Sequence, residues 1–237
     1  MQLKDADCTV VQSEGKVMVI DTGAPEDAQT VMLALERLGI ERIHCLLLTH
    51  PDRDHIGNAS AILQQYPVEQ IRMPNVKKNS EIESVLLCEI AAQNIAINHP
   101  EKTGETFAFG ACSMRMFPGY ETAYEQINDH SIAAVLTCGT VRVFFGGDIE
   151  NKRIKEFLHD PIAPCDVVKM PHHGRDEKKS AALLSMLRPK ICVVTADHAE
   201  EAVEAALSAS RVCYTAEAAV YITIHDNKLE LERGTNE

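Results

Sequence analysis

Short apolar runs alternate with amphipathic segments along the first half of the chain. The turn SEGK separates the runs DCTVVQ and VMVIDTG, which predicts a β-hairpin. Apolar positions at helical spacing predict a helix over 26–38, ended by Gly39, and a short one over 58–65. Between them, IHCLLLT is apolar almost throughout, which is typical of a strand buried on both faces of its sheet.

A longer helix is predicted at SEIESVLLCEIAAQNI, with Ser80 as its N-cap and Glu83 completing a capping box. The chain then returns to strands, first near 106–116 and then in the hairpin SIAAVLTCGTVRVFFGGD. Helices and strands alternate after that: a helix over 151–158, the strand CDVVKM, the helix KKSAALLSML, the strand KICVVT and the helix AEEAVEAALSA. Short strands are predicted near 211–214, 220–224 and 228–232.

Each half therefore has antiparallel strands followed by alternating strands and helices. This order predicts an α/β fold in which two sheets stack face to face with helices outside, a four-layer αββα sandwich. No Gly/Ser/Pro-rich linker divides the chain, so we expect a single domain over 1–237.

Polar clusters directly follow five of the predicted strands. They read DTG, THPDRDH, GGD, PHHG and TADH. Ligands of α/β proteins bind beyond the carboxyl ends of the strands, so we expect these five clusters to line one site.

Composition narrows the class of protein. The chain has 237 residues and a formal net charge of −12, which disfavours holding nucleic acid by bulk electrostatics. No apolar stretch approaches the about 20 residues of a membrane span, and no secretory signal is visible, so no membrane association is expected. The eight cysteines form no CxxC pair and lie mostly in apolar runs. We expect reduced, buried thiols and a cytoplasmic protein.

The densest cluster is LLLTHPDRDHIGN, which places His50, Asp52, Asp54 and His55 in six residues after an apolar strand. Imidazole nitrogens and carboxylate oxygens suit Zn²⁺, Mn²⁺ or Fe²⁺. Positions 50 and 52 project to one side of the loop, whereas 54 and 55 can turn to a second point. The loop therefore predicts two neighbouring cations, although a solvated, helix-capping loop would also use aspartates here.

Later residues are candidates to complete this centre. Asp148 ends a buried strand, where a carboxylate needs a cation or hydrogen bonds, although it could instead cap the next helix. In VVKMPHHGR either His172 or His173 could bind metal while the other contacts substrate or carries a proton. His130 precedes a strand and could complete the first cation position.

These motifs resemble the metallo-β-lactamase fold superfamily, with its His-x-[His/Asp]-x-Asp-His loop, a later aspartate after GD and a late histidine. THPDRDHIGN, FFGGDIE and VVKMPHHG are more narrowly similar to the soluble hydrolase domain of ComEC-type competence proteins. The chain departs from that branch at KDAD, which keeps only Asp7 of its usual GQGD turn, at TADHAEE, and at Arg175, where serine is common. DNA uptake is not implied, because the sequence contains no channel segment.

The resemblance implies a role for each matched residue. His50 and Asp52 would bind metal one, Asp54, His55 and His172 would bind metal two, and Asp148 would bridge them. His130 and Ser131 lie where the superfamily places a further metal-binding histidine and its neighbour.

The function expected from these residues is hydrolysis with a metal-activated hydroxide. The cofactors would be two divalent ions, Zn²⁺ in first place with Mn²⁺ or Fe²⁺ as alternatives. Asp54 would orient the hydroxide, and His173 would assist the leaving group. Substrate contacts are expected from Ser131, His173 and Arg175.

Basic residues near the centre favour a phosphodiester, either a small molecule or a nucleic acid. They include Arg175, Lys178 and Lys179 after the PHHG box and Lys77 and Lys78 in VKKN, although such short runs are often solvated surface. Two alternatives stay open: an acyl, thioester or lactone hydrolase of the same fold, and a metal-stabilised binding module without catalysis. The sequence identifies no protein partner.

Overall fold

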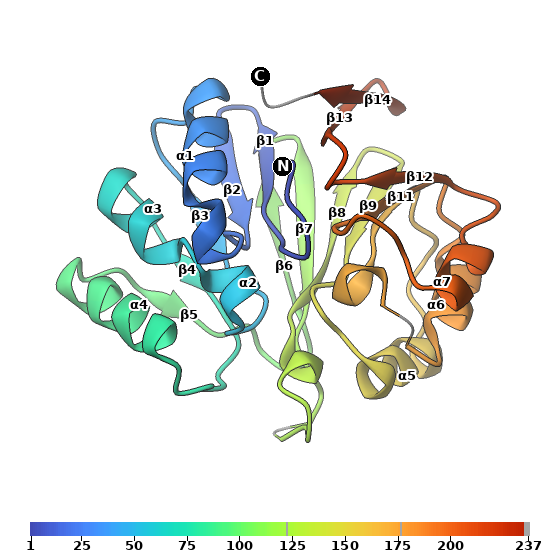
Figure 1. Ribbon diagram of the computed structural model, residues 1–237, viewed down its shortest axis with the longest axis horizontal. Coiled ribbons are helices and arrows are strands. Elements are labelled where there is room, and N and C mark those ends of the chain that lie inside the picture. The colour runs from blue at the N-terminus through green and yellow to red at the C-terminus, as the bar shows by residue number, and fades with distance from the viewer. Residues whose placement is uncertain (122, 176, 235–237) are drawn as a thin grey trace.

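The computed structural model describes residues 1–121, 123–175 and 177–234 and contains two stacked sheets (Figure 1). The first sheet has five strands in the order of the chain: β1 (Thr9–Ser13), β2 (Lys16–Ile20), β3 (Cys45–Leu47), β4 (Ile71–Arg72) and β5 (Ile97–Asn98). β1 and β2 pair antiparallel, with Thr9 opposite Ile20, and the later neighbours pair parallel. The predicted first hairpin and buried strand are confirmed.

The second sheet has seven strands and repeats this plan. Its order is β12 (Arg211–Tyr214), β11 (Ile191–Val194), β10 (Val167–Lys169), β9 (Val141–Phe145), β8 (Ala133–Cys138), β7 (Cys112–Phe117) and β6 (Glu105–Phe109). β6 to β9 pair antiparallel, and β9 to β12 pair parallel. The expected sequence of antiparallel and then alternating elements is therefore confirmed in both halves.

Helices cover the outer face of each sheet (Figure 1). The first group is α1 (Ala28–Arg37), α2 (Arg53–Ile56), α3 (Ala59–Gln65) and α4 (Glu81–Ala92). The second is α5 (Asn151–His159), α6 (Ser180–Leu187) and α7 (Glu201–Ala206), and short 3₁₀ turns lie at Pro25–Asp27, Asn128–His130 and Pro171–Gly174. The four layers form an αββα sandwich, which confirms the predicted fold class. No helix in the described part of the chain is long and apolar enough to cross a lipid bilayer.

The central strands have uninterrupted apolar sequences because side chains on both of their faces are buried. In the first sheet Val19 and Leu46 face the outer helices, whereas Ile20 and Leu47 face the second sheet. In the second sheet, Phe144 packs under the helices and its neighbours in β9 face inward. Alternation with a period of two therefore fills three apolar layers, and this is the physical reason for runs without polar positions.

A separate hairpin closes one end of the layer between the sheets. Its strands are β13 (Ala219–His225) and β14 (Lys228–Gly234), which confirms the last two predicted strands. Every second side chain packs against the inner layer, including Val220, Ile222 and Leu231. The opposite end of this layer is where the polar strand ends lie.

The start of α4 differs in one detail from the predicted capping box. Ser80 caps the helix as expected, since its Oγ accepts from the Glu83 amide at 3.2 Å. The Glu83 carboxylate, however, accepts from the amides of Lys78 and Asn79, at 3.0 and 2.6 Å, rather than from that of Ser80. The buried Glu83 thus fixes the backbone of the loop before the helix, including Lys78.

The expectation of reduced thiols is wrong for one pair of cysteines. Cys112 and Cys138 lie directly opposite each other on β7 and β8, with 4.4 Å between their Cα atoms, and form a disulfide. Since the pairing register of two strands decides which cysteines meet, spacing along the sequence does not reveal this bond. The other six cysteines are free. Cysteine usage therefore no longer supports the expectation of a cytoplasmic protein.

Candidate metal centre

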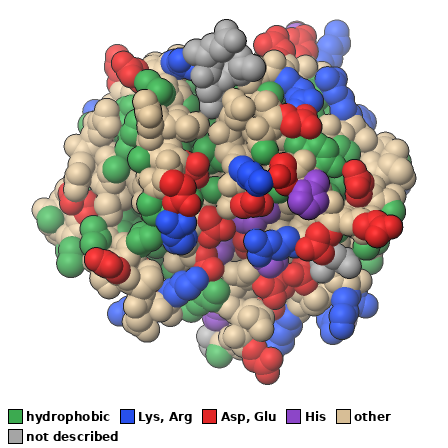
Figure 2. Space-filling view, viewed as in Figure 1, with side chains coloured by type: hydrophobic (Ala, Val, Ile, Leu, Met, Phe, Trp, Pro, Cys, Tyr) green, Lys and Arg blue, Asp and Glu red, His purple; other side chains and the backbone are tan. Residues whose placement is uncertain are grey.

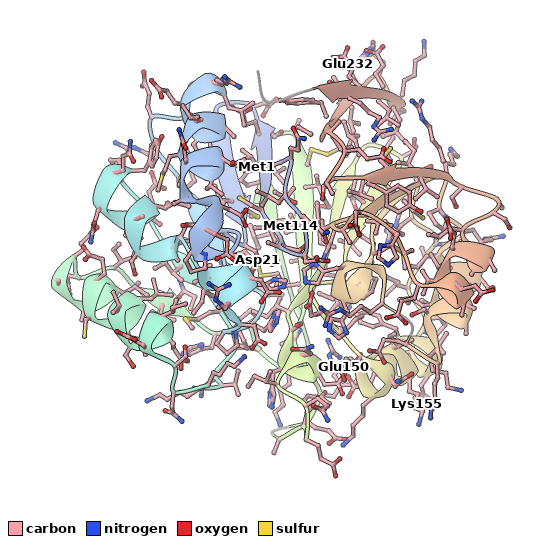
Figure 3. All side chains as sticks on the ribbon, viewed as in Figure 1. Met1, Asp21, Met114, Glu150, Lys155 and Glu232 are labelled. Atoms are coloured by element: carbon pink, nitrogen blue, oxygen red, sulfur yellow. A yellow bond between two sulfur atoms is a disulfide. The ribbon has the colours of Figure 1, made fainter. Side chains whose placement is uncertain are left out.

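Polar side chains from five strand ends meet at one edge of the sandwich. Asp21 follows β2, the loop 49–55 follows β3, and Asp148 follows β9. His173 follows β10, and Thr195 follows β11. Figure 2 shows histidine side chains near the middle of one face, bordered by acidic and basic side chains. Figure 3 shows that Asp21 and Glu150 lie on the two sides of this region, so both halves of the chain contribute.

Asp21 holds the loop after β3 in place. Its carboxylate accepts from the Thr49 amide at 2.7 Å and from the Thr49 hydroxyl at 2.8 Å. It also lies 2.8 Å from Nδ1 of His55, and all three residues are buried. Because Nδ1 of His55 faces this carboxylate, Nε2 is directed to the other side, where Asp148 Oδ1 lies at 3.2 Å. A carboxylate behind a histidine is the usual way to orient a metal-binding imidazole.

His173 is held from behind in a similar way. Its Nδ1 lies 2.9 Å from Thr195 Oγ1 and 3.4 Å from Asp7 Oδ1. Its Nε2 lies 3.2 Å from Asp54 Oδ2 and 3.3 Å from Asp148 Oδ2. The second nitrogen of this ring therefore points at the same carboxylate as that of His55.

Four side chains thus converge with the geometry of a metal centre. One donor atom from each of Asp54, His55, Asp148 and His173 lies within 4.8 Å of the other three. Nε2 of His55 and Oδ1 of Asp148 face each other, yet both are buried without a hydrogen-bond partner. Burying such atoms unpaired is costly, and a divalent cation would satisfy both. The residues present therefore fit a metal ion.

The carboxylates of this group remain in the charged form that binds metal. Burial alone would raise the pKa of Asp148, but His55 and His173 beside it hold that pKa well below its ordinary value. Asp148 in turn raises the pKa of both imidazoles, so a cation bound here would take the place of their protons. Neither Asp52 nor Asp148 acts as a helix cap. Asp52 occupies the N-cap position of α2 without a side-chain cap bond, and Glu150 occupies that of α5. The capping alternative is thereby excluded for both aspartates.

A buried lysine lies beneath the centre. The Lys169 ammonium forms an ion pair with Asp7, donates to the Gly147 carbonyl at 3.1 Å and lies 3.8 Å from Asp148 Oδ1. Burial alone would lower the pKa of Lys169, but Asp7 and Asp148 raise it, so the ammonium stays charged. Lys169 thereby offsets part of the negative charge that the aspartates concentrate here.

His172 does not join the four converging side chains, contrary to the ligand assignment that the resemblance implied. Its Nδ1 lies 3.2 Å from Glu177 Oε1, and its Nε2 lies 3.1 Å from an Arg175 guanidinium nitrogen. The reason is the backbone: His172, His173 and Gly174 all have positive φ, 49°, 54° and 84°. This left-handed turn sends the two consecutive rings in different directions, and such strain is found mainly at functional sites.

Two further candidates lie outside the four converging side chains. Ser131 is fully buried, and its Oγ accepts from the Asp148 amide at 3.2 Å, so it positions Asp148, and its contact with substrate stays a prediction. His130 turns away from the centre, because its Nε2 accepts from the Tyr124 amide at 3.2 Å and its ring packs edge-on against Tyr124. Arg175 is exposed and contacts the ring of His172, and its contact with substrate stays a prediction.

His50 and Asp52 lie beside the four converging side chains. Nε2 of His50 is 4.0 Å from Asp148 Oδ2, and burial lowers the pKa of His50 well below its ordinary value, so the ring is neutral. Asp52 Oδ2 forms an ion pair with Lys78 at 2.7 Å. The metal roles of these two residues stay predictions.

Sequence reasoning assigned no role to the residues behind the centre: Asp7, Asp21, Thr195 and Lys169. Two signals pointed to three of them. Asp21 and Thr195 follow strands in DTG and TADH, and Lys169 is the one charged residue of the apolar strand CDVVKM after its first aspartate. A lysine in such a strand requires a buried carboxylate nearby.

Comparisons with known proteins agree with this geometry. The family model described as the metallo-beta-lactamase superfamily matches residues 3–198. Recombination protein 2 of Haemophilus influenzae is 26% identical over 192 residues, which cover 79% of this chain and 22% of that protein. ComE operon protein 3 of Bacillus subtilis is 24% identical over 159 residues, 67% of this chain and 20% of that protein. The chain therefore spans about a fifth of the length of these relatives.

A solved structure shows the same fold. The metallo-beta-lactamase fold protein YhfI from Bacillus subtilis superimposes with a TM-score of 0.60 at 10% identity, over 88% of each chain. The family match extends over more than three quarters of the sequence and includes all strand ends of the centre. The chain belongs to the metallo-beta-lactamase superfamily of metal-dependent hydrolases.

Proposed function

We propose that the protein hydrolyses phosphodiesters with the help of divalent metal. The observation that carries this proposal is the convergence of Asp54, His55, Asp148 and His173, in which the buried Nε2 of His55 and Oδ1 of Asp148 have no hydrogen-bond partner. Zn²⁺, Mn²⁺ and Fe²⁺ all accept this mixture of imidazole and carboxylate. A divalent cation bound there would polarise the scissile group and lower the pKa of water.

The residues of the chain then have distinct tasks. Asp54 is the donor nearest to solvent, with 29% of its side chain exposed. Its pKa is lowered, because His173 and His55 outweigh the effect of burial, so the carboxylate is charged and available to orient an attacking water. His173, which was expected to assist the leaving group, is buried among the donors. We assign contact with the leaving-group side of the substrate to the half-buried His172 instead.

Cations from both halves of the chain favour an anionic substrate. Lys78 contacts Asp52 on one side of the centre, and Arg175 contacts His172 on the other. A guanidinium and an ammonium next to a metal are suited to phosphate oxygens. The net charge of −12 disfavours a long polyanion, so a small phosphodiester or a short single strand fits better than duplex DNA.

The test is turnover by protein loaded with Mn²⁺ or Zn²⁺. We expect hydrolysis of bis-p-nitrophenyl phosphate or of a short single-stranded DNA, and its loss in Asp148→Asn. Asp226→Asn is the matched control, since Asp226 is exposed in the β13–β14 turn. Hydrolysis of a thioester or lactone without any phosphodiester cleavage would overturn the substrate class. Inactivity on all of these substrates, in protein that has bound metal, would favour the binding module.

A further inference from the structure

The donors of the centre fall into two unequal groups. Four side chains converge around His55 and His173, with donor atoms within 4.8 Å of one another. The second group has His50 and the shared Asp148, whose facing atoms are 4.0 Å apart, and Asp52 completes no such convergent group with them among the described residues. This difference suggests two cation positions of different strength.

The second group nevertheless carries marks of a ligand site. Nε2 of His50 is buried and has no hydrogen-bond partner, while its Nδ1 lies 3.2 Å from Thr49 Oγ1. Oδ1 of Asp52 is also buried without a partner. Two unpaired acceptor atoms in one loop, next to Asp148, would be satisfied by a cation.

What keeps Asp52 apart is Lys78. The ammonium lies 2.7 Å from Asp52 Oδ2, so one oxygen of the carboxylate is already bound to a cation. The backbone of Lys78 is held in place, because the buried Glu83 accepts from its amide at 3.0 Å. His130 does not join either group, and its Nε2 accepts from the Tyr124 amide.

The contact between Lys78 and Asp52 is easily broken. The two side chains are 41% and 21% exposed, and ion pairs at such positions contribute little to stability. An ion at the second position, or a phosphate group that attracts the ammonium, therefore competes with it on nearly equal terms.

We propose that the centre binds one divalent cation firmly at Asp54, His55, Asp148 and His173 and a second one weakly at His50 and Asp52, and that Lys78 competes with this second cation for Asp52. The inference rests on the metal centre of the proposed function and is independent of its substrate. An anionic substrate that draws Lys78 toward itself would release Asp52 and thereby strengthen the second position.

Calorimetric titration of metal-free protein with Mn²⁺ tests this division. We expect two binding events in the wild type, and in Lys78→Ala a second event strengthened by about two- to fivefold with the first unchanged. Lys77→Ala is the matched control, because it removes the same charge from the neighbouring exposed residue. Asp52→Ala is expected to weaken the second event alone. Far-UV circular dichroism verifies that each variant is folded.

Three results would overturn the proposal: no change in Lys78→Ala, an equal strengthening in Lys77→Ala, or loss of the first event in Asp52→Ala. Because the readout is binding, these outcomes are distinguishable from failure to cleave phosphodiesters. A protein that binds two Mn²⁺ ions as described but cleaves no phosphodiester would contradict the proposed function and still support the two cation positions.

Discussion

The two neighbouring histidines of the PHHG box have contrasting surroundings. His173 is 2% exposed and is supported by Thr195, Asp7 and, through Asp7, by the buried Lys169. His172 is half-buried and pairs with Glu177 and the exposed Arg175. Two residues of the same type can therefore differ in function, because their surroundings decide whether the ring can bind a metal ion. An imidazole fixed from behind by buried polar groups has one orientation, whereas a half-buried ring that contacts an exposed arginine can adapt to a ligand.

The largest difference is expected between His173→Ala and His172→Ala. Substitution of a residue that only orients a metal ligand already lowers metal affinity or activity by about ten- to a hundredfold. Loss of His173, which we propose as a ligand, should therefore reduce firm Mn²⁺ binding and turnover by at least about a hundredfold, whereas His172→Ala should mainly raise KM. Metal content after gel filtration, together with steady-state kinetics, measures both. Equal loss of bound metal in the two variants would erase the distinction.

Stability should differ next between the buried and the exposed cations. Lys169→Met keeps the volume but removes the ammonium that pairs with the buried Asp7, which should lower the free energy of unfolding by about 3 kcal/mol. Arg175→Met removes an exposed cation and should change it by less than about 0.5 kcal/mol. Urea denaturation of metal-free protein gives both values. A Lys169→Met variant as stable as the wild type would mean that Asp7 finds another partner or takes up a proton.

A smaller difference in metal affinity is expected between substitutions of the two carboxylates that contact Nδ1 of His55 and of His172. Asp21→Asn retains the shape of the side chain but weakens the contact that orients His55, so metal affinity should fall by about ten- to a hundredfold. Glu177→Gln makes the same change behind His172 and should leave metal affinity within about twofold. Competition with a fluorescent chelator measures the difference. Similar effects of the two substitutions would mean that both rings bind the cation.

The sequence predicted what depends on local pattern. Continuous apolar runs identified the strands buried on both faces, and the spacing of polar residues identified the loop from His50 to His55. Asp148 was found because a carboxylate after a buried strand needs a partner. These signals lie within a few residues of one another, which is why a single sequence was sufficient to identify them.

Pairings across long separations could not be read in this way. Asp7 and Lys169 are 162 positions apart, and neither has a local pattern that names the other. The choice between His172 and His173 depends on a left-handed turn that non-glycine residues seldom adopt. The disulfide between Cys112 and Cys138 depends on strand register, and the burial of Ser131 depends on how closely Gly147 approaches it.

The four converging donors come from opposite halves of the chain. Asp54 and His55 belong to the first sheet and its helices, and Asp148 and His173 belong to the second. An ion coordinated by all four would cross-link the two sheets and oppose movement of one sheet relative to the other. Neither half could assemble this coordination by itself, so the metal would report on the completed association of the layers as well as on chemistry.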